Sequence, residues 1–182
     1  MSEGASANTG RRGLLIVYTG EGKGKTTAAL GTVLRAWGHG MRLCVIQFIK
    51  SEAGRWGEIL AAERLGIEWH TLGTGFVWEP GNDAEARERA LAAWALAQEK
   101  IVSGEYDLIV LDEFTYLSKF GWLDGQETAD WLIAHKPREL HVIITGRDAP
   151  EALVAAADLV SEVRAIKHPF AAGVRAQKGI EF

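Results

Sequence analysis

Short runs of apolar residues alternate with longer mixed segments along almost the whole chain. The apolar runs predict β-strands at residues 14–18, 42–49, 67–72, 108–111, 141–145 and 159–166. The segments between them predict helices at residues 26–37, 55–65, 84–102, 126–134 and 150–157. The 84–102 segment is the clearest helix, because its apolar residues recur at helical spacing.

This alternation of strands and helices predicts an α/β fold. Strand–helix–strand units build a mainly parallel sheet with helices on both faces. We expect residues 13–182 to form a single domain, preceded by a flexible segment at residues 1–12. Residues 73–82 hold three glycines and one proline, which predict a loop. Ligands of such sheets bind beyond the carboxyl ends of the strands, so a site is expected there.

Charge and composition argue against several classes of function. The formal net charge of -4 gives no general attraction to nucleic acid or to anionic membranes. No apolar run approaches the length of a membrane span, and residues 1–12 lack the hydrophobic stretch of a secretory signal. We therefore expect a cytoplasmic protein with no nucleic-acid or membrane partner.

The single cysteine and a histidine near the carboxyl end both favour structural roles. Cys44 has no partner for a disulfide or a cysteine metal site, and it lies in an apolar predicted strand. His168 has no second histidine or carboxylate at the spacing of metal ligands. The chain also shows no set of nucleophile, base and acid.

The segment after the first predicted strand carries the most specific signal. Gly20-Glu21-Gly22-Lys23-Gly24-Lys25-Thr26-Thr27 contains the G-K-[ST] of a phosphate-binding loop, between a strand and a helix. Glycines let backbone N–H groups approach phosphate oxygens, and the helix start adds its positive end. Lys25 brings a full charge, and the Thr26 hydroxyl is the natural magnesium ligand. We predict that residues 20–27 bind a nucleotide polyphosphate.

Three details of this loop depart from the simplest pattern. Thr19 stands where the strict pattern has its first glycine, so the loop is a variant. Lys23 either touches phosphate or remains solvated. Glu21 is an acidic residue in an anion-binding loop, and it either points outward or reaches a ribose hydroxyl or a metal-bound water.

Two later strand ends carry charged residues that fit the same site. The predicted strand at 108–111 runs into Asp112 and Glu113, the pattern of a Walker B strand whose carboxylate holds magnesium directly or through water. Arg147 follows the strand at 141–145, and its rigid fork suits phosphate oxygens. A surface salt bridge is the equally weighted alternative for Arg147.

The predicted loop at 73–82 contains two aromatic residues, Phe76 and Trp78. Exposed aromatics in a glycine-rich loop favour a large flat partner. The alternative is a loop that its aromatics anchor into the body of the protein.

Several segments together make the chain resemble the P-loop type of ATP:corrinoid adenosyltransferase. The matching segments are residues 18–29, 45–50 (VIQFIK), 73–79 (GTGFVWE), 110–113 (VLDE), 145–147 (TGR), 167–170 (KHPF) and 179–182 (GIEF), in addition to Gly173 and residues 176–177. The glycine loop is shared with many nucleotide enzymes, whereas the aromatic loop and the carboxyl-terminal tail are far more specific. The resemblance implies a P-loop NTPase fold of the RecA-like type.

The resemblance also implies a reaction, in which the 5′-deoxyadenosyl group of ATP passes to the Co(I) of a reduced corrinoid. Triphosphate is released, and the reaction belongs to adenosylcobalamin biosynthesis or salvage. Co(I) is itself a strong nucleophile that attacks the ribose C5′, which agrees with the missing protein nucleophile. In this family ATP lies reversed in the loop, so the whole triphosphate is the leaving group.

Residue roles and partners follow from the same resemblance. Lys25, Arg147 and Glu113 are the implied catalytic residues: Lys25 and Arg147 neutralise the triphosphate, and Glu113 holds Mg²⁺ together with Thr26. Phe76 and Trp78 correspond to aromatics that pack under the corrin and displace its lower axial ligand. The implied partners are a second copy of the chain in a homodimer and a flavoprotein reductase as electron donor.

Two features differ from the usual family pattern. Position 21 is usually Asn or Asp, and Glu21 is longer. Many relatives also carry a long charged helix before the first strand, for which residues 1–12 are too short. We therefore expect closure over the corrinoid to differ.

Three alternative functions use the same loop. A RecA-like ATPase motor or switch would employ Glu113 to activate water, a small-molecule kinase would transfer the γ-phosphate, and a nucleotide-sensing regulator would only bind. The aromatic loop and the carboxyl-terminal tail have no assigned role in any of the three.

Overall fold

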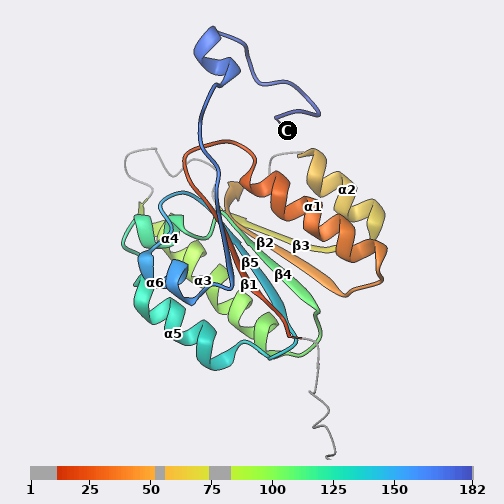
Figure 1. Cartoon of the computed structure of the whole chain (residues 1–182), viewed down its shortest axis with the longest axis vertical. Helices are drawn as coiled ribbons and strands as arrows, with labels where there is room; N and C mark the ends of the chain where they lie inside the picture. Colours follow the sequence, from red (N-terminus) through yellow and green to blue (C-terminus); the bar gives the residue numbers. More distant parts are fainter. Residues whose placement is uncertain (1–11, 52–55, 74–82, 182) are drawn as a thin grey trace, which may run out of the picture.

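The computed structural model describes residues 12–51, 56–73 and 83–181, and in them a single parallel sheet forms the centre of the molecule (Figure 1). Its strands are β1 Leu15–Thr19, β2 Leu43–Ser51, β3 Glu68–Gly73, β4 Leu108–Asp112, β5 His141–Thr145 and β6 Leu159–Glu162. The strand order is β3-β2-β4-β5-β1-β6, and all neighbours pair in parallel. The predicted α/β class is confirmed.

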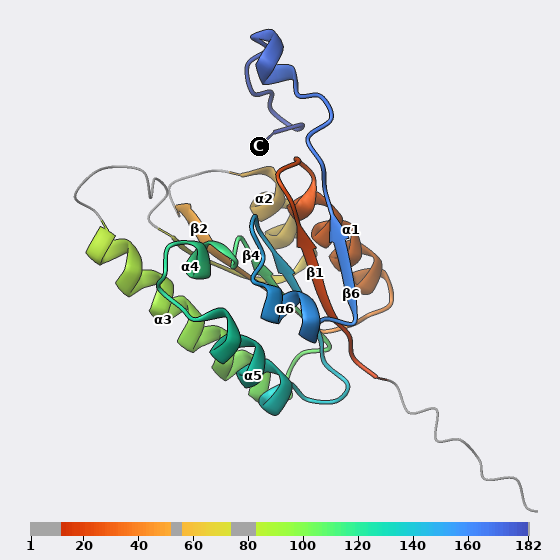
Figure 2. The ribbon, with the colours of Figure 1, turned by 60° about the vertical axis from the view of Figure 1, so that its left-hand side comes forward.

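Helices cover both faces of this sheet (Figure 2). Two pack on one face, α1 Lys25–Gly38 and α2 Gly57–Leu65. The other face carries α3 Asp83–Val102, α4 Tyr116–Lys119, α5 Gly125–His135 and α6 Glu151–Ala156. A 3-10 helix, η1 Pro169–Ala172, lies in the tail. No helix among the described residues is long and apolar enough to cross a membrane.

Two apolar cores follow from this layering. Alternate residues of the central strands point to opposite faces, so Val17, Ile46 and Leu111 pack under α3 and α5, whereas Ile16, Val45 and Val110 pack under α1. These strands are buried on both faces, which explains why the sequence shows continuous apolar runs there. The two cores fix the strand ends in space, and the strand ends carry the polar residues of interest.

The last strand is shorter than the sequence pattern predicts. The prediction of a strand at 159–166 is wrong beyond Glu162, where β6 ends. β6 is an edge strand that pairs only with β1, and Thr19 opposite Glu162 is the last residue of β1. The chain beyond Glu162 therefore has no strand left to pair with.

The carboxyl-terminal tail continues past the sheet on the side of its carboxyl ends (Figures 1 and 2). It rises from β6, turns through η1 and returns toward the start of α1. Ile166, Phe170 and Ile180 are largely exposed along this path. The predicted flexible segment 1–12 lies, apart from Arg12, outside the described residues, as does the predicted loop 73–82 apart from Gly73.

Candidate functional site

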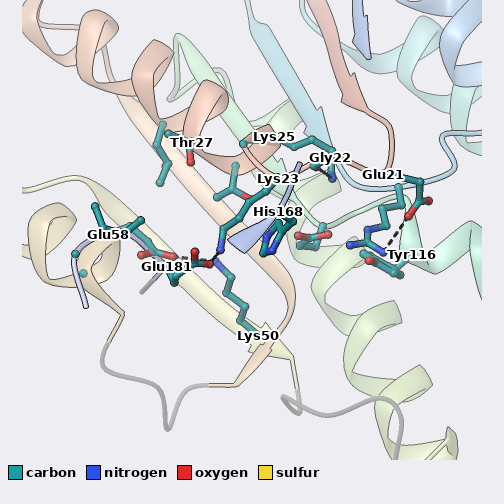
Figure 3. A pocket seen from close by; sticks show the side chains of 18 residues that line it. Glu21, Gly22, Lys23, Lys25, Thr27, Lys50, Glu58, Tyr116, His168 and Glu181 are labelled. Atoms are coloured by element: carbon teal, nitrogen blue, oxygen red, sulfur yellow. Dashed lines mark hydrogen bonds and ion pairs between the residues drawn. The ribbon is translucent and has the colours of Figure 1, made fainter. Parts of the chain in front are cut away.

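A pocket of about 500 Å³ opens at the carboxyl edge of the sheet (Figure 3). The predicted phosphate loop contributes Glu21, Gly22, Lys23, Gly24, Lys25, Thr26 and Thr27 to its wall. Glu113 and Arg147 also line it, so three of the predicted polar clusters meet in one place. Further lining residues come from β2, α2, α4 and the tail: Lys50, Gly57, Glu58, Tyr116, His168, Gly179, Ile180 and Glu181.

The glycines of the loop are required by the backbone and by the tail behind it. Gly20 and Gly24 adopt φ values of 97° and 121°, a region that favours glycine. Gly22 donates from its N–H to the carbonyl of Val163 at 2.7 Å, and an added Cβ would come within 2.6 Å of Arg164. The variant residue Thr19 accepts a hydrogen bond from Ala149 N at 3.2 Å, which ties the loop to the segment after β5.

Lys25 lies folded under the loop rather than extended into solvent. Its Nζ donates to the carbonyl oxygens of Gly20 and Gly22, both at 2.8 Å. Burial lowers the pKa of its ammonium group, and the charge of Glu113 offsets part of this effect. The loop's own carbonyl oxygens thus hold the ammonium group of a lysine that lines the pocket, where an anion bound to the loop would meet its charge.

Asp112 is the hub of a buried hydrogen-bond network. Its Oδ1 accepts from the hydroxyls of Thr26 at 2.8 Å and Thr145 at 2.7 Å. Its Oδ2 accepts from Gln47 Nε2 at 2.9 Å, and Gln47 in turn accepts from Trp69 Nε1 at 3.1 Å. Asp112 is only 1% exposed and does not line the pocket. Its Oδ1 thus holds the Thr26 hydroxyl in place from behind.

Glu113 differs from its neighbour because one carboxylate oxygen has nothing to bind. Its backbone is held at φ 60° and donates from N to the Thr145 hydroxyl at 2.9 Å. Its Oε2 is buried and has no hydrogen-bond partner among the described residues. Burial raises the pKa of this carboxyl, and the charge of Asp112 raises it further. Thr26 lines the same pocket as Glu113, and a buried carboxylate oxygen without a partner fits an oxygen-seeking cation such as Mg²⁺.

Three cations around the pocket are each paired with a carboxylate from another segment. Figure 3 labels two of these cations, Lys23 and Lys50, and the three carboxylates. Arg147 Nη1 lies 3.0 Å from Glu21 Oε2, and Lys50 Nζ lies 2.8 Å from Glu58 Oε1. Lys23 pairs with Glu181 of the tail. Arg147 and Glu21 therefore pair with each other, and the half-exposed Lys23 pairs with the tail; whether Arg147 and Lys23 bind phosphate stays a prediction.

The sequence motifs did not single out four residues of the site: Lys50, Glu58, Gln47 and Glu181. Lys50 and Gln47 lie within the matching segment 45–50, and Glu181 lies within 179–182. No spacing rule connects them with the phosphate loop, because the sheet and the returning tail bring them there.

His168 and Cys44 agree with their predicted structural roles. His168 Nδ1 accepts from Phe170 N at 3.1 Å, which caps η1, although the residue also lines the pocket. Burial raises the pKa of the Cys44 thiol to about 12, so it is no nucleophile at neutral pH. Cys44, Glu68 and His70 form a cluster, yet Lys100 Nζ already binds Glu68 Oε1 at 2.8 Å.

The predicted corrinoid residues Phe76 and Trp78 lie outside the described residues. Gly73 is the last described residue before them, and its position in β3 is fixed. An added Cβ there would overlap the backbone of Ile49 and Lys50. Gly73 therefore packs directly against the backbone of β2 next to Lys50.

Comparison with known proteins gives one family and one fold. The sequence profile of the family described as ATP:corrinoid adenosyltransferase BtuR/CobO/CobP matches residues 11–182. The chain is 43% identical over 173 residues to Corrinoid adenosyltransferase CobA of Salmonella typhimurium, covering 94% of this chain and 86% of that protein. It is 40% identical over 179 residues to a corrinoid adenosyltransferase of Sinorhizobium sp, covering 97% and 84%.

Among solved structures, the flagellar accessory protein FlaH of Methanocaldococcus jannaschii has a similar fold. The TM-score is 0.56 at 11% identity, over 84% of this chain and 71% of that one. With the parallel sheet and the glycine loop between β1 and α1, this likeness confirms the predicted P-loop NTPase fold of the RecA-like type.

Proposed function

This chain belongs to the ATP:corrinoid adenosyltransferase family and is a transferase, and on that basis we propose that it adenosylates the Co(I) of a reduced corrinoid with ATP and releases triphosphate. The observation that carries the proposal is the pocket itself. It joins a phosphate loop to cations on several sides, and none of its described lining residues is a cysteine or serine nucleophile.

The chemistry asks the protein for positioning and for charge. The electron pair of Co(I) forms the Co–C bond at C5′, the C5′–O bond breaks, and its electron pair leaves with the triphosphate. Negative charge therefore grows on the bridging oxygen of the leaving group. Fixed cations and N–H groups around that oxygen lower the barrier because they need no reorganisation during the reaction.

The phosphate loop and two cations supply this stabilisation. Residues 20–27 cradle the triphosphate with their backbone N–H groups at the start of α1, except that of Gly22, which already donates to Val163. Lys25 neutralises it from below, and Arg147 does so from the end of β5. Arg147 exchanges Glu21 for phosphate when the nucleotide enters, because an exposed ion pair costs little to open.

Thr26 and Glu113 would hold Mg²⁺ in this site. The donor set is two oxygens, one of them the unpartnered Oε2 of Glu113, which is the chemistry that this cation prefers. Bound Mg²⁺ supplies charge neutralisation on the triphosphate oxygens. Asp112 orients the Thr26 hydroxyl, and because its own oxygens are already bonded, any contact with the ion runs through water.

We propose that Phe76 and Trp78 bind the corrin face, as the membership of the family implies. In the sequence they follow Gly73, which packs against the backbone of Lys50, a residue that lines the pocket. We further propose that residues 13–182 act as one domain, that two copies form a homodimer, and that a flavoprotein reductase supplies electrons.

One anaerobic assay tests the proposed reaction. The protein is incubated with ATP, Mg²⁺ and chemically reduced cobalamin, and the corrin spectrum and the phosphate products are followed. We expect adenosylcobalamin and triphosphate in equal amounts. ADP and phosphate with an unchanged corrin spectrum would contradict the proposal and support an ATPase or a kinase. Lys25→Met is the control, because it removes the central cation and should abolish both products.

A further inference from the structure

Lys50 is a pocket cation for which the proposed reaction has so far given no role. It lies near the end of β2, and its side chain is only 22% exposed. Its Nζ is 2.8 Å from Glu58 Oε1, 3.9 Å from Asp112 Oδ2 and 5.2 Å from the centre of the Trp56 ring. Figure 3 shows Lys50 and Glu58 on one side of the pocket and Glu21 and Tyr116 on the other.

The carboxylate of Asp112 lies between Lys50 and Thr26, the predicted metal ligand. Asp112 accepts the Thr26 hydroxyl on Oδ1 and faces Lys50 with Oδ2. A triphosphate held at Thr26 would meet the negative charges of Asp112 and Glu113 at close range. A cation beside Asp112 offsets this repulsion, in addition to Lys25 and Arg147, which line the same pocket.

We propose that Lys50 is a further catalytic residue, which binds the triphosphate leaving group, and that Glu58 is the counter-ion it gives up when the nucleotide enters. The inference rests on the proposed function and deepens it. In the bond-breaking step, the electron pair of the C5′–O bond passes to the triphosphate, whose charge Lys50 shares. Lys50 keeps its proton throughout, so the step needs no further reactant.

The exchange of Glu58 for phosphate is physically cheap. Glu58 lies in the first turn of α2, where free backbone N–H groups and the helix dipole favour a carboxylate. The N-cap residue Trp56 makes no capping hydrogen bond with its side chain, so Glu58 keeps a favourable environment after Lys50 leaves. The long stem of a lysine carries its ammonium group, with three donors, over several ångströms without backbone movement.

The test uses magnesium triphosphate as the probe and the full chain without corrinoid. Lys50→Met should weaken triphosphate binding about tenfold or more, because one phosphate contact is lost. Glu58→Gln should tighten it about twofold to threefold, because Lys50 no longer has a competing anion. Calorimetric titration at fixed salt measures both. Equal weakening by the two variants, or no effect of Lys50→Met, would overturn the proposal.

Two further variants separate binding from folding. Lys50→Arg keeps the charge and should retain binding within about threefold of the original, which a loss of packing would not allow. Arg89→Met with Glu85→Gln removes an ion pair of 3.0 Å on α3, away from the pocket, and should leave triphosphate affinity unchanged. Thermal unfolding of every variant shows whether the fold persists.

Turnover distinguishes this inference from the proposed function. With preformed Co(I) corrinoid, Lys50→Met should lower kcat in addition to weakening triphosphate. If the original chain makes the adenosyl product while Lys50→Met binds triphosphate normally, the role of Lys50 alone is refuted. If the original chain makes no adenosyl product, the proposed function is refuted and the leaving-group role of Lys50 falls with it.

Discussion

At the scale of single residues, the adjacent carboxylates of Asp112 and Glu113 have different surroundings and therefore different roles. Both carboxylate oxygens of Asp112 accept hydrogen bonds, whereas Oε2 of Glu113, a residue that lines the pocket, is buried without a partner among the described residues. Asp112 is the last residue of β4, and Glu113 follows it with a positive φ of 60°, outside the extended backbone of the strand. Within the described part of the chain, only that of Glu113, of these two adjacent carboxylates, has an oxygen free to bind a cation.

Glu113 gives a pH-dependent prediction for the metal-free protein. Its native pKa is raised above the unfolded value, so the native state binds more protons and stability falls as pH rises through that interval. Glu113→Gln should therefore raise the unfolding temperature at about pH 7, with the gain vanishing toward about pH 4. The same change should lower turnover on the order of 100-fold.

Thermal unfolding across pH, in the presence of a chelator, measures the first effect. Glu99→Gln replaces an exposed carboxylate on α3 and should show no comparable gain. A gain for Glu113→Gln that persists at low pH would show that the burial of Glu113 is not its cause.

The sequence predicted the residues that a local motif marks. The phosphate loop, Asp112 and Glu113 could be found because their spacing follows one strand and one turn. Gln47, Lys50 and Glu58 could not, since they reach the site through strand order and through the approach of α2. No local sequence pattern distinguishes a lysine that lines a pocket at a strand end from a lysine on the surface.

At the scale of elements, the turn after β5 is held unusually tightly against α4. Thr115 donates to the carbonyl of Arg147 at 2.5 Å, and Gly146 donates from N to Tyr18 O at 3.2 Å. Gly146 has φ 144°, and an added Cβ would overlap the Thr115 hydroxyl. This packing directs Arg147 into the pocket although Arg147 itself sits in a turn.

We predict that Gly146→Ala destabilises the protein by roughly 3 kcal/mol, because it combines backbone strain with a clash. Triphosphate affinity should fall as well, since Arg147 moves. Urea unfolding and calorimetry measure the two effects. Gly104→Ala is the matched control, because Gly104 has φ 72° and open space around it, so only about 1 kcal/mol is expected. Equal losses in both variants would contradict the clash.

The elements themselves were largely predictable, and the misses have physical causes. Long periodic segments such as α3 and fully buried strands such as β4 match their predicted positions within a residue or so. α4 has four residues, too few for any periodicity to show. β6 ends early because its partner strand turns away into the phosphate loop, which no pattern within β6 reveals.

At the scale of the whole molecule, the tail is a wall of the pocket more than a part of the core. Gly179, Ile180 and Glu181 line the site, and Glu181 pairs with Lys23 of the loop. Phe170 is 80% exposed and Ile180 76%, so the tail buries little apolar surface within the chain. Its contribution should therefore appear in binding rather than in folding.

Deleting residues 168–182 should shift the unfolding temperature by no more than about 4 °C, the equivalent of roughly 1 kcal/mol. The apparent KM for ATP should rise about threefold to tenfold, because one side of the pocket is removed. Glu181→Gln in the full chain isolates the pair with Lys23 and should reproduce little of the KM change. A collapse of the unfolding temperature would show that the tail belongs to the cooperative core.

The ion pairs of the pocket have a consequence for the way the protein meets its substrate in solution. The described lining residues include four basic side chains, Lys23, Lys25, Lys50 and Arg147, and four acidic ones, Glu21, Glu58, Glu113 and Glu181. The four positive and four negative charges thus largely cancel, and the electrostatic potential of the site is weak at a distance from the protein. A highly charged nucleotide is not drawn in from afar, so its affinity should depend only weakly on ionic strength. Selectivity for the triphosphate then comes from short-range fit after arrival.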